Sequence, residues 1–496
     1  MTSLKEDFRL KIKWISGILT SVLLLTLVSP VSAKDELELK DELIYDTLVD
    51  RYFNKKIDND YEVNAIDPAA FNGGDFDGMA SEILFVKEMG FTALSIGPVF
   101  STATYDGKSV LDYTEFERHF GTDEEFEALV TEVHDQEMKV IVDIPTQQVN
   151  ENHVWASENP AWFTENEDGS LALDTANSEV QEALISTFEE FTETYEVDGY
   201  RLQNADQLDP AFILDFSEAM KGAGSSYLLS DREMKETPGF DAVVLPGVEE
   251  TLRAAYKNFD QDLTGVSAVM EQSDGKLIQV DSLLGSRFTA DVVDVNGFPP
   301  TRWTLLLTQL LTMPGIPVIQ YGSEAAMNGI EPTESHQILD MAVDKELVDH
   351  ITDLTSLRNE SEALRTGELE MLHDEDGWLV YKRSNDEETW IVAINNSSST
   401  QNINLSADVI GEGQELRGLF ESDIIRQEDN GEYRVTQDRE IAEVFHVTEE
   451  TSLNTAYIVT LAIMYVVFML FLWFVWRKGK QRKADAAKQQ ANEKTV

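Results

Sequence analysis

The stretch Pro314-Gly315-Ile316-Pro317-Val318-Ile319-Gln320-Tyr321-Gly322 decides the fold. It is a short apolar run bounded by glycines and rich in β-branched residues, so it predicts a fully buried strand. Similar apolar runs lie at 93–96, 140–142 and 227–229, and amphipathic helical stretches lie at 123–137, 179–194 and 210–221. Strands that alternate with helices between residues 43 and 344 predict parallel βα units. We therefore expect an α/β fold built on an eight-stranded (β/α)8 TIM barrel.

The texture of the sequence changes after residue 357. Alternating apolar runs at 378–381 and 389–394 are separated by Asp-Gly and Asn-Ser turns. This pattern is typical of antiparallel strands joined by tight turns. The sequence therefore predicts a barrel over 34–350, with a short inserted segment at about 145–180, and a C-terminal antiparallel β-sandwich domain over 351–448.

Both ends of the chain carry long apolar runs. Residues 1–33 combine four basic residues, an apolar stretch and the small residues Val31-Ser32-Ala33, which indicates a secretory signal peptide; an uncleaved signal anchor is the alternative. Residues 455–476 predict a transmembrane helix with Trp473 and Trp476 at its end, although a buried core helix has the same composition. The basic segment 477–496 predicts a cytoplasmic tail, and hence a single-pass protein of the cell membrane with an extracellular ectodomain.

The charge and the cysteine count exclude several functions. The chain has 92 Asp and Glu against 38 Lys and Arg, and 27 basic against 88 acidic residues lie outside the signal and the tail, a formal charge of −61. A nucleic-acid binder needs a basic face, so we expect no nucleic-acid partner. The chain has no cysteine, which excludes disulfides, thiolate metal sites and cysteine nucleophiles.

Several motifs follow one another in the order and spacing of a known family. They are Leu48-Val49-Asp50-Arg51-Tyr52, the segments 71–78 and 112–122, a strand ending at Asp143, Asp198-Gly199-Tyr200-Arg201-Leu202, and the segment 314–324. Taken together they resemble the α-amylase family of glycoside hydrolases, family 13, over about 400 residues. The resemblance implies a retaining mechanism on α-glucans with a carboxylate nucleophile, a carboxylic acid and a third, stabilising carboxylate.

The three catalytic positions implied by this resemblance are substituted. Gln203 stands at the nucleophile, Asp231 at the acid and Leu284 at the stabilising carboxylate. An amide cannot form the glycosyl ester, the Asp side chain is one methylene shorter than Glu, and leucine carries no charge. Asp291 and Asp294 lie close downstream of Leu284, but aligning either of them breaks the match over 301–314.

The implied sugar contacts are also replaced, whereas scaffold residues remain. The substituted positions are Lys108, Gln147-Gln148, Asp206-Gln207 and Leu283. Arg201 is the retained substrate-binding candidate, and we expect Asp143 to pair with it because a buried guanidinium needs a carboxylate. Tyr321 and Glu324 match the closing motif of the eighth strand and are expected to pack at the barrel mouth.

Calcium is the cofactor that the resemblance implies. The matching oxygen donors in the first loop are Asn54, Asn59, Asp60, Gly73 and Asp75. They suit a hard cation. Lys56 replaces a usual oxygen ligand, so its ammonium is the alternative occupant of the site.

Two functions fit these residues. The first is a surface-anchored pseudoenzyme that binds α-glucan or a partner protein, because the scaffold is kept while the catalytic positions are lost. The second is an active α-glucan hydrolase or transglycosylase that uses relocated carboxylates at Asp206, Asp231 or Glu233. A pair of carboxylates about 5 to 5.5 Å apart in the barrel mouth would favour the second.

Overall fold

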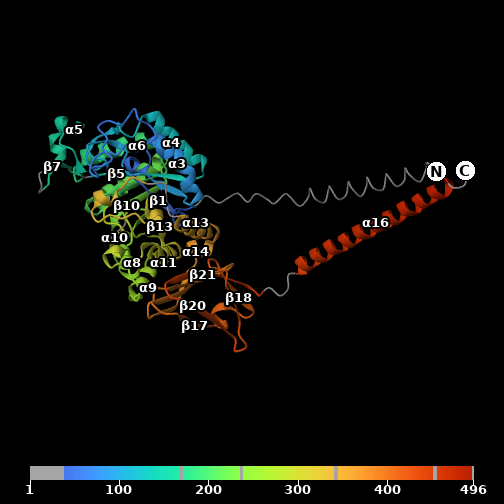
Figure 1. Ribbon diagram of the computed structural model, residues 1–496. Helices are drawn as coiled ribbons and strands as arrows, with labels where there is room; N and C mark the ends of the chain where they lie inside the picture. Colours follow the sequence, from blue (N-terminus) through green and yellow to red (C-terminus); the bar gives the residue numbers. More distant parts are fainter. Residues whose placement is uncertain are drawn as a thin grey trace.

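The computed structural model describes residues 38–146, 148–166, 171–234, 238–339, 345–450 and 455–493. The expected signal peptide at 1–33 and Gln147 lie outside these residues. Two folded domains and one long helix are visible in Figure 1.

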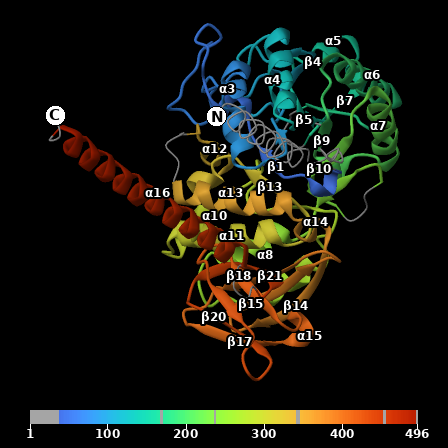
Figure 2. The same ribbon diagram turned by 90° about the vertical axis from the view of Figure 1, so that its right-hand side faces the viewer.

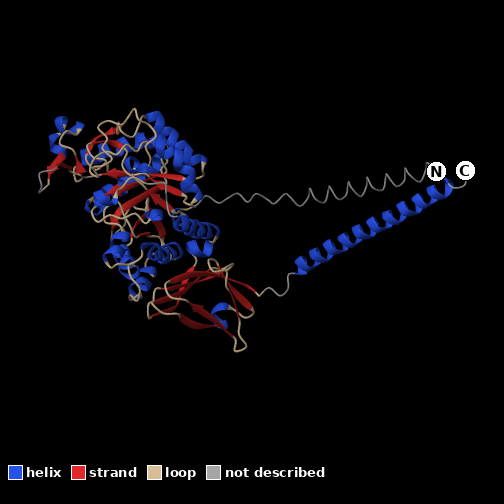
Figure 3. Ribbon diagram, in the orientation of Figure 1, coloured by secondary structure: helices blue, strands red, loops and turns tan. Residues whose placement is uncertain are grey.

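The first domain is a closed barrel of eight parallel strands, which confirms the predicted fold class. Around the barrel the order is β1-β13-β12-β11-β10-β9-β5-β2. The strands are β1 (Ile44–Asp46), β2 (Ala93–Ser95), β5 (Lys139–Pro145), β9 (Gly199–Gln203), β10 (Tyr227–Glu233), β11 (Ala242–Val244), β12 (Leu277–Gln279) and β13 (Ile316–Gln320). Figure 3 shows these strands at the centre of the domain with the helices outside them.

Helices cover the outside of the barrel, and the three predicted ones lie within two residues of their expected ends. They are α3 (Phe76–Glu88), α4 (Asp123–Asp135), α6 (Ser178–Tyr195), α7 (Pro210–Ala223), α8 (Val248–Tyr256), α9 (Thr264–Met270), α10 (Phe288–Asp294), α11 (Pro299–Thr312), α13 (Lys345–Glu360) and α14 (Glu362–Thr366). Local signals set their starts. The Asp75 carboxylate accepts from the backbone N–H of Gly78 at the start of α3, and Thr122 with Glu125 forms a capping box for α4.

The first strand, β1, ends before the motif at Leu48 to Tyr52 begins. Residues Leu48 to Tyr52 do not form a strand, because β1 ends at Asp46 and Val49–Tyr52 is a single helical turn, α2. The buried Asp50 carboxylate accepts hydrogen bonds from the backbone N–H groups of Asn72 and Gly73. These hydrogen bonds fix the helical turn α2 against the first loop.

A small sheet is inserted on the side where the barrel strands end. Its order is β3-β4-β6-β8-β7, from β3 (Phe100–Thr102), β4 (Val110–Phe116), β6 (Gln148–Val149), β8 (Leu171–Leu173) and β7 (Phe163–Glu165). Two short helices, α5 (Val154–Glu158) and η2 (Pro160–Trp162), complete it. The hydroxyl of Tyr113 donates to the carbonyl of Pro145 at 2.5 Å and fixes this sheet to the end of β5.

The second domain is antiparallel. Its larger sheet has the order β14-β15-β16-β21-β18-β19, and β17 pairs with β20. The elements are β14 (Glu368–Glu375), β15 (Trp378–Ser384), β16 (Thr389–Asn395), β17 (Gln401–Ser406), α15 (Ala407–Ile410), β18 (Gln414–Gly418), β19 (Ile424–Arg426), β20 (Glu432–Gln437) and β21 (Ile441–Glu449). Residue 351, the expected start of this domain, lies inside α13, whose buried side chains pack on the barrel. Arg302 of α11 joins the domains by donating to Asn396 at 2.6 Å and to Glu440 at 2.7 Å.

The C-terminal helix α16 (Thr455–Glu493) extends away from both domains (Figure 1), and Figure 2 shows its far end, marked C, projecting beyond them. Its segment Val459–Ala484 is long and apolar enough to cross a membrane, and none of that segment is buried. The helix does not end where the apolar run ends but continues through the basic residues from Arg477. Arg477 lies over the ring of Trp473 and Lys480 over that of Trp476.

Candidate functional site

The candidate site is a small cavity where the barrel strands end. Side chains at the ends of β1, β5, β9, β10 and β12 line it, which is the face where the sites of such barrels lie. Its volume is about 20 Å³. One water molecule needs roughly 10 to 15 Å³ on this measure, so the cavity admits a water molecule and not a sugar ring.

The structure brings most of the sequence-predicted positions together. Six of them line this one cavity: Lys108, Arg201, Gln203, Asp231, Leu283 and Leu284. Gln148 and Gln207 are exposed and lie outside the lining. The positions that correspond to the family's nucleophile, acid and stabilising carboxylate therefore meet at the barrel mouth, and only one of them is an acid.

Arg201 is held between two carboxylates. Its guanidinium donates from Nε and Nη2 to Asp143 at 2.7 and 2.8 Å, and from Nη1 and Nη2 to Asp46 at 3.0 and 2.7 Å. Asp143 is also the register partner of Arg201 in the neighbouring strand. Burial raises the pKa of Asp46, and the Arg201 guanidinium opposes this shift. Four of the five N–H donors of this arginine are thus directed at structural partners.

Sequence reasoning missed Asp46. The available signal was an acidic residue at the end of the apolar run Leu43-Ile44-Tyr45, where a buried strand leaves no room for an unpaired charge.

Gln203 and Asp231 are both engaged by the protein. Gln203 Nε2 donates to Asp143 Oδ2 at 3.1 Å. The Asp231 carboxylate accepts from the backbone N–H of Asn204 at 3.1 Å and of Ala205 at 3.4 Å, at the start of η3 (Ala205–Gln207). Burial raises the pKa of Asp231 to about 6, and these backbone donors oppose the shift. Asp231 therefore caps a turn.

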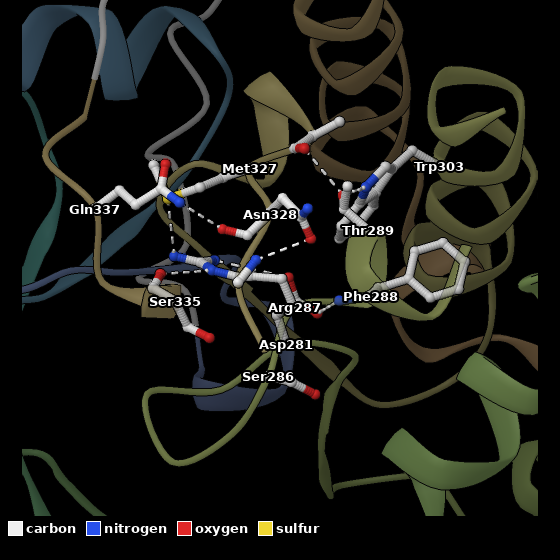
Figure 4. A network of polar contacts seen from close by, with 12 residues as sticks. Asp281, Ser286, Arg287, Phe288, Thr289, Trp303, Met327, Asn328, Ser335 and Gln337 are labelled. Carbon is white, nitrogen blue, oxygen red and sulfur yellow. Dashed lines mark hydrogen bonds and ion pairs between the residues drawn. The ribbon is translucent and has the colours of Figure 1, made fainter. Parts of the chain in front are cut away.

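At the end of β12 the cavity is lined by the polar side chains of Gln279 and Ser282 and by two leucines. Leu283 and Leu284 lie there, and Leu48 lines the same cavity. The neighbouring Asp281 serves the scaffold, since its Oδ1 accepts from the backbone N–H of Phe288 at 2.6 Å and its Oδ2 lies 3.6 Å from Arg287 (Figure 4). A positive charge that developed in this cavity would face leucine side chains on that side.

The carboxylates considered as relocated catalysts do not meet in the cavity. Asp206 is exposed and lies 3.5 Å from Arg232 Nε, and Glu233 accepts from the backbone N–H of Gly247 at 2.7 Å. Neither residue is in the lining. Asp291 pairs with Arg253 at 2.8 Å on α10, and Asp294 ends the same helix. Asp231 is the only one of the three relocated candidates that lines the cavity.

Residues from two loops close the cavity from outside. Lys108 Nζ lies 3.3 Å from Asp106 Oδ2, and both line the cavity. His336 lines it too, with its Nδ1 3.0 Å from the Tyr105 hydroxyl. Burial lowers the pKa of His336 to about 3, so the imidazole is neutral. No motif in the sequence marked His336, whose role depends on a contact 231 residues away.

Tyr321 and Glu324 lie fully buried after β13, Glu324 within η4 (Ser323–Ala325). Tyr45 of β1 donates to Glu324 Oε1 at 2.8 Å. Burial raises the pKa of Glu324. Both residues thus belong to the packed interior.

The first-loop residues named as calcium ligands make hydrogen bonds within the protein. The Asp75 carboxylate accepts from three backbone N–H groups, those of Lys55, Lys56 and Gly78. Asn54 and Asn59 use their amides as donors, to Asp60 at 2.9 Å and to the carbonyl of His119 at 2.7 Å. Within the described ranges, no three His, Asp or Glu residues gather around a common metal position. The Asp75 carboxylate and the two amide nitrogens are thus engaged by the protein, and Lys56 forms an ion pair with Glu125 beside them.

The parallel barrel, the C-terminal antiparallel domain and the cavity at the strand ends together define the architecture of this chain. The family pattern described as "Alpha amylase, catalytic domain" matches residues 46–170, and "Alpha-amylase C-terminal domain" matches residues 367–445. The chain is 32% identical to the crystal structure of an Anoxybacillus α-amylase, with a TM-score of 0.81, over 84% of this chain and 100% of that one. The chain belongs to the α-amylase family.

Two further relatives are similar to this chain. The crystal structure of an α-amylase from Geobacillus thermoleovorans, complexed with acarbose, is 30% identical with a TM-score of 0.79, over 84% of this chain and all of that one. A cyclomaltodextrinase from Geobacillus thermopakistaniensis is 28% identical over 69% of this chain. That match spans 66% of the relative's own length.

Proposed function

We propose that this protein is a cell-surface, membrane-anchored member of the α-amylase family that does not hydrolyse α-glucans and acts by binding a partner. The observation that carries the proposal is the barrel mouth, where Gln203, Asp231 and Leu284 line a cavity of about 20 Å³. A glycosyl ester cannot form at an amide, and Asp231, which stands at the family's acid position, is bound to backbone N–H groups. The cavity has no room for a glucosyl unit, which favours a protein partner over α-glucan in the mouth.

The direct test is the release of reducing ends from starch, maltodextrins and cyclodextrins by the purified full-length chain. We expect no release above background, because nucleophile and stabilising charge are both missing and such losses act together. A matched Asp231→Asn variant should give the same result. Hydrolysis that Asp231→Asn abolishes would show that the chain is an enzyme.

The second candidate function is an active hydrolase or transglycosylase of α-glucans. Two observations favour it: Asp231 lines the cavity with a pKa raised to about 6, as a general acid requires, and the relatives bear the names of α-amylases and a cyclomaltodextrinase. It needs a second carboxylate near Asp231. Asp206→Asn and Glu233→Gln are the variants that would then lose the activity.

The anchoring part of the proposal rests on α16. The apolar run of α16 ends at Trp476 and is followed at once by Arg477, Lys478 and Lys480, which favours a cytoplasmic tail and domains outside the cell. Protease added to intact cells should remove both domains and spare the tail. Domains that resist the protease until the cells are lysed would reverse the orientation.

The proposal also includes a role for an ion pair in the first loop. The ion pair of Lys56 with Glu125 joins the loop to the start of α4. We propose that this pair stabilises the loop where the family resemblance implied calcium.

A further inference from the structure

An open groove of about 530 Å³ lies beside the barrel mouth. One wall is the first-loop segment 65–72, and the other is the segment 328–338 after β13, which includes α12 (Pro332–Ser335). We call it the outer groove. His336 lines both this groove and the cavity of the mouth, so the two are neighbours.

The outer groove presents aliphatic side chains to water. Ile66 is 93% exposed, Ile330 68% and Ile338 40%, and all three line it. Single exposed aliphatic residues are normal, but three that share one depression form a contiguous apolar patch. Patches of this kind rimmed by polar residues mark interaction sites.

The two walls are held in place from behind. Arg51 bridges them, since its Nη2 donates to the carbonyls of Pro68 and Ala70 at 2.7 and 3.1 Å and its Nε to that of His336 at 2.7 Å. Arg287 donates from Nε to the carbonyl of Ser335 at 2.9 Å (Figure 4). The groove is therefore preformed, and an occupant does not have to order its walls on binding.

Acidic side chains predominate in the two wall segments of the outer groove, whereas the cations Arg51 and Arg287 lie buried behind its walls. Residues 57–72 and 328–338 contain six acidic residues and no Lys or Arg: Asp58, Asp60, Glu62, Asp67, Glu331 and Glu334. A second copy of this chain bears the same charge and is repelled, as is an anionic membrane surface. Among the residues that the structure describes, the lining contains no Trp, Tyr or Phe on which a sugar ring could stack. Apolar complementarity and charge complementarity together point to a cationic polypeptide.

We propose that the outer groove binds a segment of a partner protein that carries two or three aliphatic side chains flanked by Lys or Arg. The aliphatic side chains cover Ile66, Ile330 and Ile338, and the basic residues face the acidic rim. The inference deepens the partner-binding part of the proposed function and rests on it.

The test uses the full-length chain in nanodiscs of uncharged phosphatidylcholine, so that the lipid does not attract basic peptides. A random library of 12-residue displayed peptides is selected on this chain and counter-selected on the Ile66→Ser, Ile330→Ser double variant. We expect the enriched peptides to carry net positive charge and at least two aliphatic residues. A synthetic peptide of the enriched sequence should bind the double variant at least about tenfold more weakly than the unmodified chain. Its binding to the unmodified chain should weaken as the salt concentration rises from 50 to 500 mM.

Matched controls separate the groove from general effects. Leu84→Ser on α3 and Leu214→Ser on α7 remove exposed aliphatic side chains elsewhere and should leave peptide binding unchanged. Glu331→Lys keeps the apolar surface and should weaken the basic peptide by about two- to fivefold. All four substituted aliphatic residues are exposed, so unchanged melting temperatures are expected to show intact folding.

Three outcomes would overturn the inference: no enrichment, equal enrichment on the double variant, or enriched peptides without positive charge. The hydrolysis assay tests the chemistry of the barrel mouth, whereas the peptide selection tests binding in the outer groove. A chain that hydrolyses starch but still selects basic aliphatic peptides would refute the non-hydrolytic function and leave the groove assignment standing. An inactive chain without selection would refute the groove alone.

Discussion

Gln203 Nε2 donates a hydrogen bond to Asp143 Oδ2 at 3.1 Å, and the same carboxylate holds Arg201. This contact joins the position of the lost nucleophile to the buried ion pairs of the barrel mouth. The amide fits there because it supplies a donor to a carboxylate without adding charge. A carboxylate at residue 203 would instead face Asp143 directly.

Gln203→Asp should not create an enzyme and should destabilise the protein by about 1 to 3 kcal/mol at pH 7, because two buried carboxylates then lie within hydrogen-bond distance. Repulsion from Asp143 would raise the pKa of the carboxyl introduced at residue 203 in the folded state. The loss of stability should therefore shrink as the pH falls toward 4. Urea unfolding at both pH values measures this. The matched change Gln207→Asp, at an exposed position, should stay within about 0.5 kcal/mol of the unmodified chain. Starch hydrolysis by Gln203→Asp alone would contradict the prediction.

Arg201→Met should cost about 3 to 5 kcal/mol of stability, because it leaves the buried Asp46 and Asp143 without their cation. The loss should be smaller at low pH, where the two carboxyls become protonated. Arg426→Met removes a half-exposed partner of Glu415 and should cost no more than about 1 kcal/mol. Equal losses in the two variants would mean that burial of the ion pairs does not matter.

Asp231 should make the protein less stable as the pH rises from about 4 to 6. Its folded pKa of about 6 lies above the value of about 3.9 expected in the unfolded chain, so the folded state binds the proton more tightly. Its contribution is complete below pH 4 and disappears as the pH passes 6, with a slope of at most about 1.4 kcal/mol per pH unit. The free energy of unfolding of Asp231→Asn, subtracted from that of the unmodified chain at pH 4, 5, 6 and 7, isolates this term. If this difference in the free energy of unfolding increased with pH, the predicted direction would be wrong.

Lys56→Gln should lower stability by about 0.5 to 1 kcal/mol, because it removes the partly buried ion pair with Glu125. Millimolar calcium or a chelator should leave the melting temperature of the unmodified chain unchanged, since the loop donors are already engaged. Lys345→Gln breaks a more exposed pair with Asp349 and serves as the control. A melting temperature that rises by several degrees with calcium would instead establish a calcium site, because a ligand that binds the folded state raises its stability.

The sequence by itself determined the barrel, the antiparallel domain and the family. Strand and helix periodicity are local properties, so the run at 316–320 and the helices near 123, 179 and 210 could be placed without the structure. The motif spacing also selected Gln203, Asp231 and Leu284, which line one cavity because strand ends meet at one face of a barrel.

Tertiary structure alone decided what those side chains contact. Asp46 pairs with Arg201 across 155 residues because the barrel closes in one register, and Asp231 turns to the backbone of η3 because Asn204 and Ala205 offer unpaired N–H groups there. His336 meets Tyr105 only when two distant loops fold over the mouth, and the same folding forms the outer groove. Contacts of this range have no periodic or spacing signal, since they depend on chain closure and side-chain direction.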